Sequence, residues 1–250
     1  MRRYDQLEDE EIERYGRQLL LPEFREGEQL RLLNSRAVLI GVGGLGGPAA
    51  LHLAGSGLGA LRLVDSDRVA LDNLHRQVAF RTADIGEPKT KVICRAIQAL
   101  NSQVSVEEHR GPLNADNIDS LLLGADVVLE CSDGPETKFL VNDWCVRHRL
   151  PLVIGGAIGW RGQLTVVSPG GPCYRCLFKA PSDEMLRSCR EAGVIGPLVG
   201  VIGSLQALEA IRLVLWPERF KNRLLDFDGE SGRWRTISLE RDDRCPVHGE

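Results

Sequence analysis

Short apolar runs alternate with amphipathic stretches along the first 155 residues of the chain. Apolar runs of strand length predict buried strands at 37–40, 60–64, 104–109, 126–131 and 152–154. Apolar residues three and four positions apart predict helices at 8–21, 26–33, 48–56, 89–100, 116–123 and 138–148. Because strands and helices alternate from residue 37 onward, the sequence predicts a doubly wound, mainly parallel sheet.

The pattern changes after about residue 155. Alternating apolar and polar residues predict antiparallel strands at 163–168 and 234–240, and a short apolar run predicts one more strand at 224–227. A cysteine-bearing loop at 170–193 precedes a long, mostly apolar helix expected over 200–215. The chain shows no internal repeat and no low-complexity linker. We therefore expect one α/β domain over residues 1–250, with a Rossmann-like, mainly parallel sheet that is extended by antiparallel strands.

A glycine-rich turn, Gly41-Val42-Gly43-Gly44-Leu45-Gly46, joins the first of these strands to the helix that follows it. Gly41 and Gly43 permit a bend and a close backbone approach that a Cβ atom would block. Free N–H groups at the start of the helix form a site for phosphate. Asp65 ends the second strand, where a carboxylate accepts hydrogen bonds from a ribose. This order predicts nucleotide binding, and the alternative is a turn that needs its glycines only for packing.

Polar residues after the second strand favour a polyphosphate ligand over a nicotinamide. The segment from Asp65 and Asp67 leads to Asn73, Arg76 and Gln77, which offer one fixed cation and two amide groups. Lys89 adds a further cation at the start of a predicted helix. The alternative interpretation of Arg76 and Lys89 is that both are solvated surface charges.

Two pairs of metal-ligating residues share the same spacing: Cys173 with Cys176, and Cys245 with His248. Two such pairs suit a closed, tetrahedral structural Zn²⁺ site, so we expect a C-terminal zinc knuckle, with a reduced, metal-free loop as the alternative. Cys189 lies outside both pairs, next to Arg190, and a cation beside a thiol lowers its pKa toward a reactive thiolate.

Composition narrows the class of protein. A net charge of −4 gives no basic surface for nucleic acid, so we expect no nucleic-acid partner. The first residues are too charged for a secretory signal, and the apolar stretch 194–216 is interrupted by Pro197 and by charged residues, so we expect no membrane span. Seven cysteines without an export signal favour a reducing, cytoplasmic location.

A series of motifs follows along the chain in this order: GVGGLG, VDSD, DNLHRQ, IGEPK, ECSDG, CYRC and CREAGVIGPLVGVIGSLQALEAI. In sequence and order these motifs resemble the ThiF/MoeB/HesA family of bacterial adenylyltransferases, which are related to the ubiquitin-activating enzymes. The later stretch LDFDGESGRWRTISL looks most similar to the ThiF type. This resemblance implies ATP- and Mg²⁺-dependent adenylation of the C-terminal glycine carboxylate of a ubiquitin-like sulfur carrier (ThiS type), with release of pyrophosphate, in thiamine biosynthesis. A MoeB-type reaction on the molybdopterin synthase small subunit (MoaD type) is the alternative.

The resemblance also implies roles for individual residues. Asp65 would bind ribose, while Asn73, Arg76 and Lys89 would hold the phosphates. Asp133, which follows the strand at 126–131, would coordinate Mg²⁺; its alternative role is a helix N-cap ahead of Pro135. In this family the first arginine of the element Arg14-Tyr15-Gly16-Arg17-Gln18 reaches the ATP site of the partner subunit, which implies a homodimer. Some relatives link the cysteine equivalent to Cys189 covalently to the carrier, and in others that cysteine is dispensable, so a non-catalytic Cys189 is the alternative.

The resemblance divides the domain into three parts. Residues 1–36 form N-terminal helices, 37–155 the nucleotide-binding part, and 156–250 the part that binds the carrier and zinc. A carrier with a Gly-Gly tail is the expected partner, and a cysteine desulfurase or a rhodanese-type protein is the candidate sulfur donor. The competing hypotheses are a relative that adenylates a peptide C-terminus, a nicotinamide or flavin oxidoreductase, and a non-catalytic nucleotide-binding scaffold.

Overall fold

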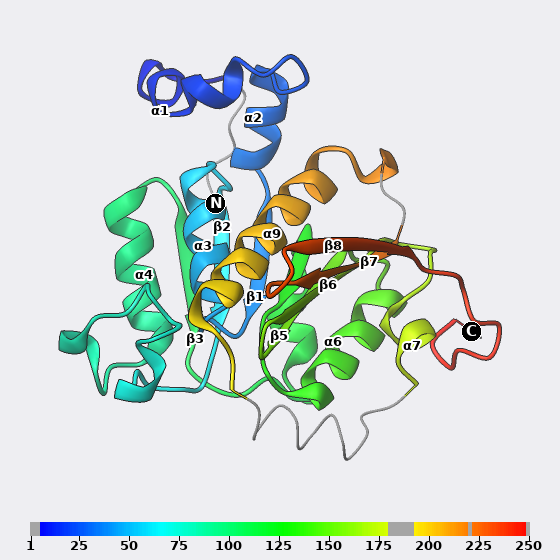
Figure 1. Cartoon of the computed structure of the whole chain (residues 1–250). Helices are drawn as coiled ribbons and strands as arrows, with labels where there is room; N and C mark the ends of the chain where they lie inside the picture. The colour runs from blue at the N-terminus through cyan, green and yellow to red at the C-terminus, as the bar shows by residue number, and fades with distance from the viewer. Residues whose placement is uncertain (1–5, 180–192, 220–221, 249–250) are drawn as a thin grey trace.

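The computed structural model describes residues 6–179, 193–219 and 222–248, and its centre is an eight-stranded mixed sheet (Figure 1). The strand order is β3-β2-β1-β4-β5-β6-β7-β8. The strands are β1 (Arg36–Ile40), β2 (Ala60–Val64), β3 (Ser105–His109), β4 (Val127–Glu130), β5 (Leu152–Ile158), β6 (Arg161–Val167), β7 (Arg223–Asp228) and β8 (Arg233–Ser238). The strands β3, β2, β1, β4 and β5 pair with their neighbours in parallel, and β5, β6, β7 and β8 pair antiparallel. This arrangement confirms the predicted fold class.

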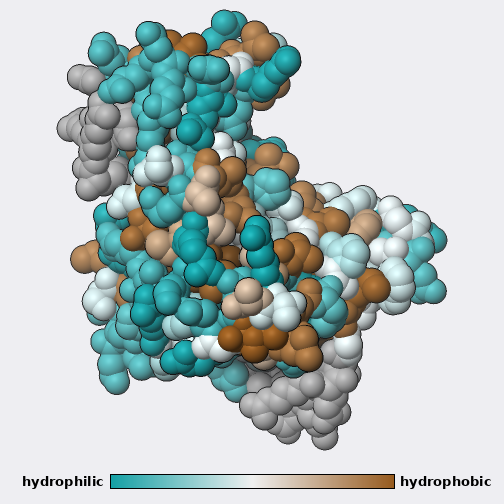
Figure 2. All heavy atoms as spheres, turned by 90° about the vertical axis from the view of Figure 1, so that its left-hand side faces the viewer, coloured by the Kyte–Doolittle hydropathy of each residue, from teal (hydrophilic) through white to brown (hydrophobic). Residues whose placement is uncertain are grey.

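Helices cover both faces of this sheet. They are α1 (Asp9–Leu19), α2 (Glu26–Leu33), α3 (Gly46–Gly55), α4 (Lys89–Leu100), α5 (Ile118–Leu122), α6 (Pro135–Arg147), α7 (Tyr174–Leu177) and α9 (Gly196–Leu215). Three short 3₁₀ helices are η1 (Leu71–Asn73), η2 (Thr82–Asp84) and η3 (Pro217–Arg219). The helices α1 and α2 project from the rest of the molecule, at the top of Figures 1 and 2. On the face seen in Figure 2 this projection is mostly hydrophilic.

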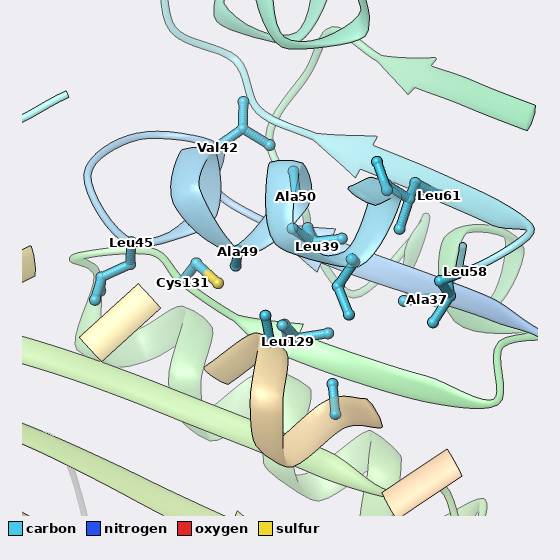
Figure 3. Close-up of a cluster of buried hydrophobic side chains, with 14 of the residues drawn as sticks. Ala37, Leu39, Val42, Leu45, Ala49, Ala50, Leu58, Leu61, Leu129 and Cys131 are labelled. Carbon is cyan, nitrogen blue, oxygen red and sulfur yellow. The ribbon is translucent and has the colours of Figure 1, made fainter. Parts of the chain in front are cut away.

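Alternate residues of the central strands supply two hydrophobic cores. Leu39 of β1 joins the core beneath α3, α4 and α9, while Val38 and Ile40 join the core beneath α5 and α6. Figure 3 shows the first core, where the small residues Ala49 and Ala50 of α3 allow this helix to lie close to the strands. Because α3 is held closely against β1, the glycine-rich turn between them is tightly constrained.

The helix α9 is buried despite its polar residues. Within the described residues it is the one helix long and apolar enough to cross a membrane by length and composition, yet it packs on α3 and on strands β4 to β6. The buried Gln206 side chain donates to the backbone oxygens of Glu130 and Val153, at 2.8 and 3.2 Å. Glu209 accepts from Arg212 and Arg223. The polar groups that interrupt this helix therefore attach it to the sheet.

Three helices begin earlier than the sequence pattern predicts. The helix α3 starts at Gly46 rather than at 48, α6 at Pro135 rather than at 138, and α9 at Gly196 rather than at 200, with Pro197 in its first turn. Proline is well tolerated in the first turn, because the N–H that it lacks has no partner within the helix there. The residues just before the predicted starts of α6 and α9 therefore form the first turns of these two helices.

Candidate active site

A cavity of about 980 Å³ opens at the carboxyl ends of β1, β2 and β4. Ligands of open α/β sheets bind at this edge. Its walls come from the glycine-rich turn, the ends of the strands, and the start of α4 and of α6. Nine of the predicted site residues line it: Gly41, Gly43, Gly44, Asp65, Asp67, Arg76, Gln77, Lys89 and Asp133.

The glycines of the turn have different surroundings. Gly41 has a φ of +84°, which favours glycine, and an added Cβ would lie 3.0 Å from the Ser132 nitrogen. Gly43 and Gly44 line the cavity. Gly46 is buried and does not line it; an added Cβ would lie 1.9 Å from the Gly41 carbonyl oxygen. The structure therefore gives Gly46 a packing role, while the other three glycines face a potential ligand.

Asp65 is held rigidly at the end of β2. Its Oδ2 accepts the Val42 N–H and its Oδ1 accepts the Asp67 N–H, both at 2.8 Å. Burial raises the pKa of the Asp65 carboxyl, although these backbone N–H groups oppose that shift. The carboxylate is thus fixed in one orientation beside the turn, as hydrogen bonding to a ligand hydroxyl requires.

Two cations reach the cavity from separate segments. The Lys89 side chain is 7% exposed, and its Nζ lies 2.8 Å from Oδ2 of Asp67, whose side chain is 65% exposed. Arg76 donates to the Asp72 carbonyl oxygen at 2.8 Å. Gln77 also lines the cavity, and its Oε1 is buried and has no hydrogen-bond partner among the described residues. The predicted phosphate-binding groups Arg76, Gln77 and Lys89 therefore converge on one space.

Asn73 does not line this cavity. It is buried in η1, where its Oδ1 accepts the Ala70 N–H at 3.3 Å and its Nδ2 donates to Asp72 at 3.1 Å. In this structure Asn73 stabilises the turn that presents Arg76, and it does not face the cavity.

Asp133 lies in the loop between β4 and α6, is exposed, and lines the cavity. The N-cap of α6 is Gly134, and no side chain caps this helix. The alternative prediction for Asp133, a helix N-cap, is therefore wrong. An exposed carboxylate at this edge has the oxygen chemistry that Mg²⁺ prefers.

The sequence analysis did not single out several lining residues: Ser132, Lys138, Arg161, Gln163, Tyr174 and Phe178. Lys138 stands at the predicted start of the helix α6, and its side chain is 9% exposed and forms an ion pair with the fully buried Glu130. The sequence offered one signal for this ion pair: Glu130 lies at the end of a strongly apolar predicted strand, and a buried carboxylate needs a positively charged or hydrogen-bonding partner.

Four predicted metal ligands meet behind one wall of the cavity. The ligand atoms of Cys173, Cys176, Cys245 and His248 all lie within 4.8 Å of one another. The Cys173 sulfur lies 3.9 Å from that of Cys176 and 3.7 Å from that of Cys245. In the part of the chain that the structure describes, Nε2 of His248 is buried without a partner. This donor set fits a tetrahedral Zn²⁺.

The protonation preferences of this cluster also suit a cation. Burial lowers the pKa of His248, which favours the neutral imidazole that ligates metals. Burial raises the pKa of Cys173 to about 12, so its thiolate needs a nearby positive charge. The short helix α7 lies between Cys173 and Phe178, and both Tyr174 and Phe178 line the main cavity. The cluster therefore supports a wall of the candidate site.

Arg14 is not brought to the cavity of its own chain. It is exposed on α1, where it donates to the Leu100 carbonyl oxygen at 3.1 Å and lies 3.4 Å from Glu10. Cys189 lies outside the described residues.

The doubly wound sheet, with a polar cavity at its carboxyl edge and a Cys₃His cluster behind it, defines an α/β protein of the nucleotide-binding type. A model of the ThiF family matches residues 15–247, and the chain belongs to this family. The predicted family resemblance is thereby confirmed.

Named relatives share most of the chain. It is 43% identical over 245 residues to "Sulfur carrier protein ThiS adenylyltransferase" of Escherichia coli K12, covering 97% of each chain. It is 42% identical to "Adenylyltransferase and sulfurtransferase MOCS3" of Caenorhabditis briggsae, covering 95% of this chain but 60% of that relative. Among solved structures, Escherichia coli MccB with ATP has a TM-score of 0.82 and 26% identity, covering 94% of this chain and 73% of MccB.

Proposed function

We propose that this protein adenylates the C-terminal glycine carboxylate of a ubiquitin-like sulfur carrier. The observation that carries the proposal is the convergence of the glycine-rich turn, Asp65, Arg76, Lys89 and Asp133 on one cavity. Membership of the ThiF family and a relative named as a ThiS adenylyltransferase, matched along 97% of its length, support the same reaction and the use of ATP.

In the proposed reaction a carboxylate oxygen of the carrier attacks the α-phosphorus of ATP. The bond between that phosphorus and the oxygen leading to the β-phosphate breaks, so pyrophosphate leaves and a mixed anhydride with AMP remains. Both reactants are anions, so the site must neutralise charge during the attack. Lys89 and Arg76 supply fixed cations, and the turn supplies backbone N–H groups. Asp65 orients the ribose.

A Mg²⁺ ion would be held by Asp133 and would neutralise charge on the triphosphate. Zn²⁺ would be held by Cys173, Cys176, Cys245 and His248 in a closed set without an open position for catalysis. Its role in the proposal is structural. A cytoplasmic location fits the six described cysteines, which are all free thiols.

The remaining parts of the proposal concern partners. We infer a homodimer in which Arg14 acts in the ATP site of the partner subunit. A carrier of the ThiS type, and hence thiamine biosynthesis, is favoured by the full-length match to the Escherichia coli relative. The MOCS3 relatives support a MoaD-type carrier as the second candidate. The role of Cys189 in a covalent link to the carrier, and a desulfurase or rhodanese-type sulfur donor, are part of the same proposal.

Isotope exchange between pyrophosphate and ATP tests the proposal. The purified protein is incubated with Mg²⁺, ATP, labelled pyrophosphate and either a ThiS-type carrier, a MoaD-type carrier, or no carrier. Carriers that lack the last glycine serve as matched controls. We expect exchange that depends on one intact carrier, with carrier–AMP detected by mass spectrometry. Absence of carrier–AMP with every intact carrier would overturn the proposal, and a bound flavin or nicotinamide would favour an oxidoreductase.

A further inference from the structure

A buried ion pair lies in the wall of the cavity. Lys138 of α6 and Glu130 at the end of β4 have side chains that are 9% and 0% exposed. The Lys138 ammonium group donates to the Glu130 carboxylate, to the Ser132 carbonyl oxygen at 2.7 Å and to the Gly155 carbonyl oxygen at 2.8 Å. These three bonds use all three of its donors, so Lys138 lines the cavity without a free N–H for a ligand.

The Glu130 carboxylate is equally committed. Its Oε2 accepts from Lys138, and its Oε1 accepts the N–H of Ser132 at 3.0 Å as well as the Ser132 hydroxyl. Ser132 is therefore bonded by both members of the ion pair, through its N–H, hydroxyl and carbonyl groups. The next residue along the chain is Asp133, whose carboxylate lines the cavity.

The pair connects three segments that meet at this point: β4 through Glu130, the loop 131–134 through Ser132, and β5 through Gly155. Replacing a buried ion pair by apolar residues is often neutral or stabilising, so stability alone explains this pair poorly. Apolar residues could not form the directional hydrogen bonds that fix the Ser132 backbone. Because Asp133 follows Ser132 directly, these bonds also determine the position of Asp133 relative to β4.

We propose that Lys138 and Glu130 are positioning residues that fix the loop 131–134 so that the Asp133 carboxylate stays aimed at a metal–nucleotide ligand. This inference rests on the proposed function, because it takes Asp133 to be the group that meets the metal ion of the nucleotide. Lys138 and Glu130 act through Ser132 and contact no substrate.

Two measurements that need neither carrier nor turnover test the inference. Hydrogen exchange of the unliganded protein reports the loop directly: losing charge-assisted bonds should speed exchange in the peptide containing residues 131–134 about tenfold in Lys138→Met. Titration with Mn²⁺ in the presence of a non-hydrolysable ATP analogue, followed by electron paramagnetic resonance, should show about tenfold weaker Mn²⁺ binding. Lys138→Arg, which keeps a cation with several donors, should restore most of both properties.

Controls separate positioning from general destabilisation. Lys91→Met removes a lysine from an exposed ion pair with Glu87 and should leave both measurements unchanged. In an Asp133→Asn background, Lys138→Met should have little further effect on Mn²⁺ binding, because the group that it positions has been neutralised. If Lys138→Met fails to fold, the neutral pair Glu130→Gln with Lys138→Met replaces it, since no uncompensated charge is then buried.

The inference is overturned if Lys138→Met leaves the loop exchange or the Mn²⁺ affinity as in the wild type. The inference is also overturned if Lys138→Met weakens Mn²⁺ binding by the full factor in the Asp133→Asn background. A wild-type protein that binds no Mn²⁺ in the presence of the ATP analogue would overturn it as well. Failure of carrier-dependent isotope exchange in the wild-type protein, with Mn²⁺ binding intact, would instead refute the proposed reaction alone.

Discussion

Substituting Gly46 should destabilise the fold, whereas substituting Gly43 should impair the ligand site. An added Cβ at Gly46 would lie 1.9 Å from the Gly41 carbonyl oxygen, about 1.5 Å short of ordinary contact at 3.4 Å. The obstacle is backbone, so α3 or the turn must move. Overpacking typically costs about 1–3 kcal/mol, and a backbone clash belongs at the upper end. At about 3 kcal/mol, Gly46→Ala should lower Tm by about 6–12 °C for a chain of this size.

Gly43→Ala meets a softer obstacle. Its added Cβ would lie 3.1 Å from Nε2 of Gln77, a side chain that can rotate, so the cost in stability should stay below about 1 kcal/mol. The new methyl group would nevertheless narrow the turn where Gly43 lines the cavity. Loss of one backbone N–H bond to a charged phosphate, at about 1.5–3 kcal/mol, should raise the KM for ATP about tenfold or more.

Thermal unfolding and the isotope exchange assay distinguish these effects. Gly27→Ala is the matched control, because Gly27 lies in α2, is exposed, and has open space where its Cβ would be. It should change stability by less than about 1 kcal/mol, toward a more stable helix, and leave the KM unchanged. Two results would refute this assignment of roles: a Gly46→Ala protein with the same Tm as the wild type, or a Gly43→Ala protein with a lower Tm than Gly46→Ala.

Three further predictions concern the metal cluster and the cations. Mass spectrometry should find about one zinc per chain in the wild-type protein; Cys176→Ser should lose this zinc, whereas His248→Cys should keep it, because a Cys₄ set is equally suitable. A wild-type protein without zinc would contradict this prediction. Lys89→Met should raise the KM for ATP about tenfold or more and shift Tm by less than about 2 °C, since its partner Asp67 is 65% exposed; an unchanged KM would exclude Lys89 from the phosphate site. Arg14→Ala should leave the dimer intact by light scattering but abolish isotope exchange, and full exchange would remove Arg14 from the mechanism.

The sequence was most informative where one physical requirement determines the residue pattern. Alternating strands and helices predict the parallel part of the sheet, because parallel strands need crossover connections. The paired spacing of Cys173 with Cys176 and of Cys245 with His248 predicts four ligands for one ion, and the structure brings these ligands together. In both cases the chemistry leaves few alternatives.

The sequence was less informative where one residue type serves two purposes. The sequence pattern of the turn places a glycine at both position 43 and position 46 and does not distinguish their roles; only the packing of α3 shows that Gly46 meets backbone rather than ligand. Asn73 offers an amide of the kind that binds phosphate, yet the same amide closes the turn around it. Most lysines are exposed to solvent, and only the placement of Glu130 opposite Lys138 shows that this lysine has a buried partner.

Two lysines line the candidate site, and their surroundings give them different functions. Lys89 has one described carboxylate partner, Asp67, which is largely exposed to solvent. When a phosphate binds the Lys89 ammonium group instead, water can solvate the released Asp67 carboxylate, so the exchange costs little free energy. Lys138 is bonded to a fully buried carboxylate and to two backbone oxygens, and withdrawing it would leave the Glu130 carboxylate buried without its counter-ion. The charge of Lys89 is therefore available to a ligand, whereas that of Lys138 is committed to the loop that carries Asp133. A polyphosphate should accordingly displace Asp67 from Lys89 and leave the bonds of Lys138 intact.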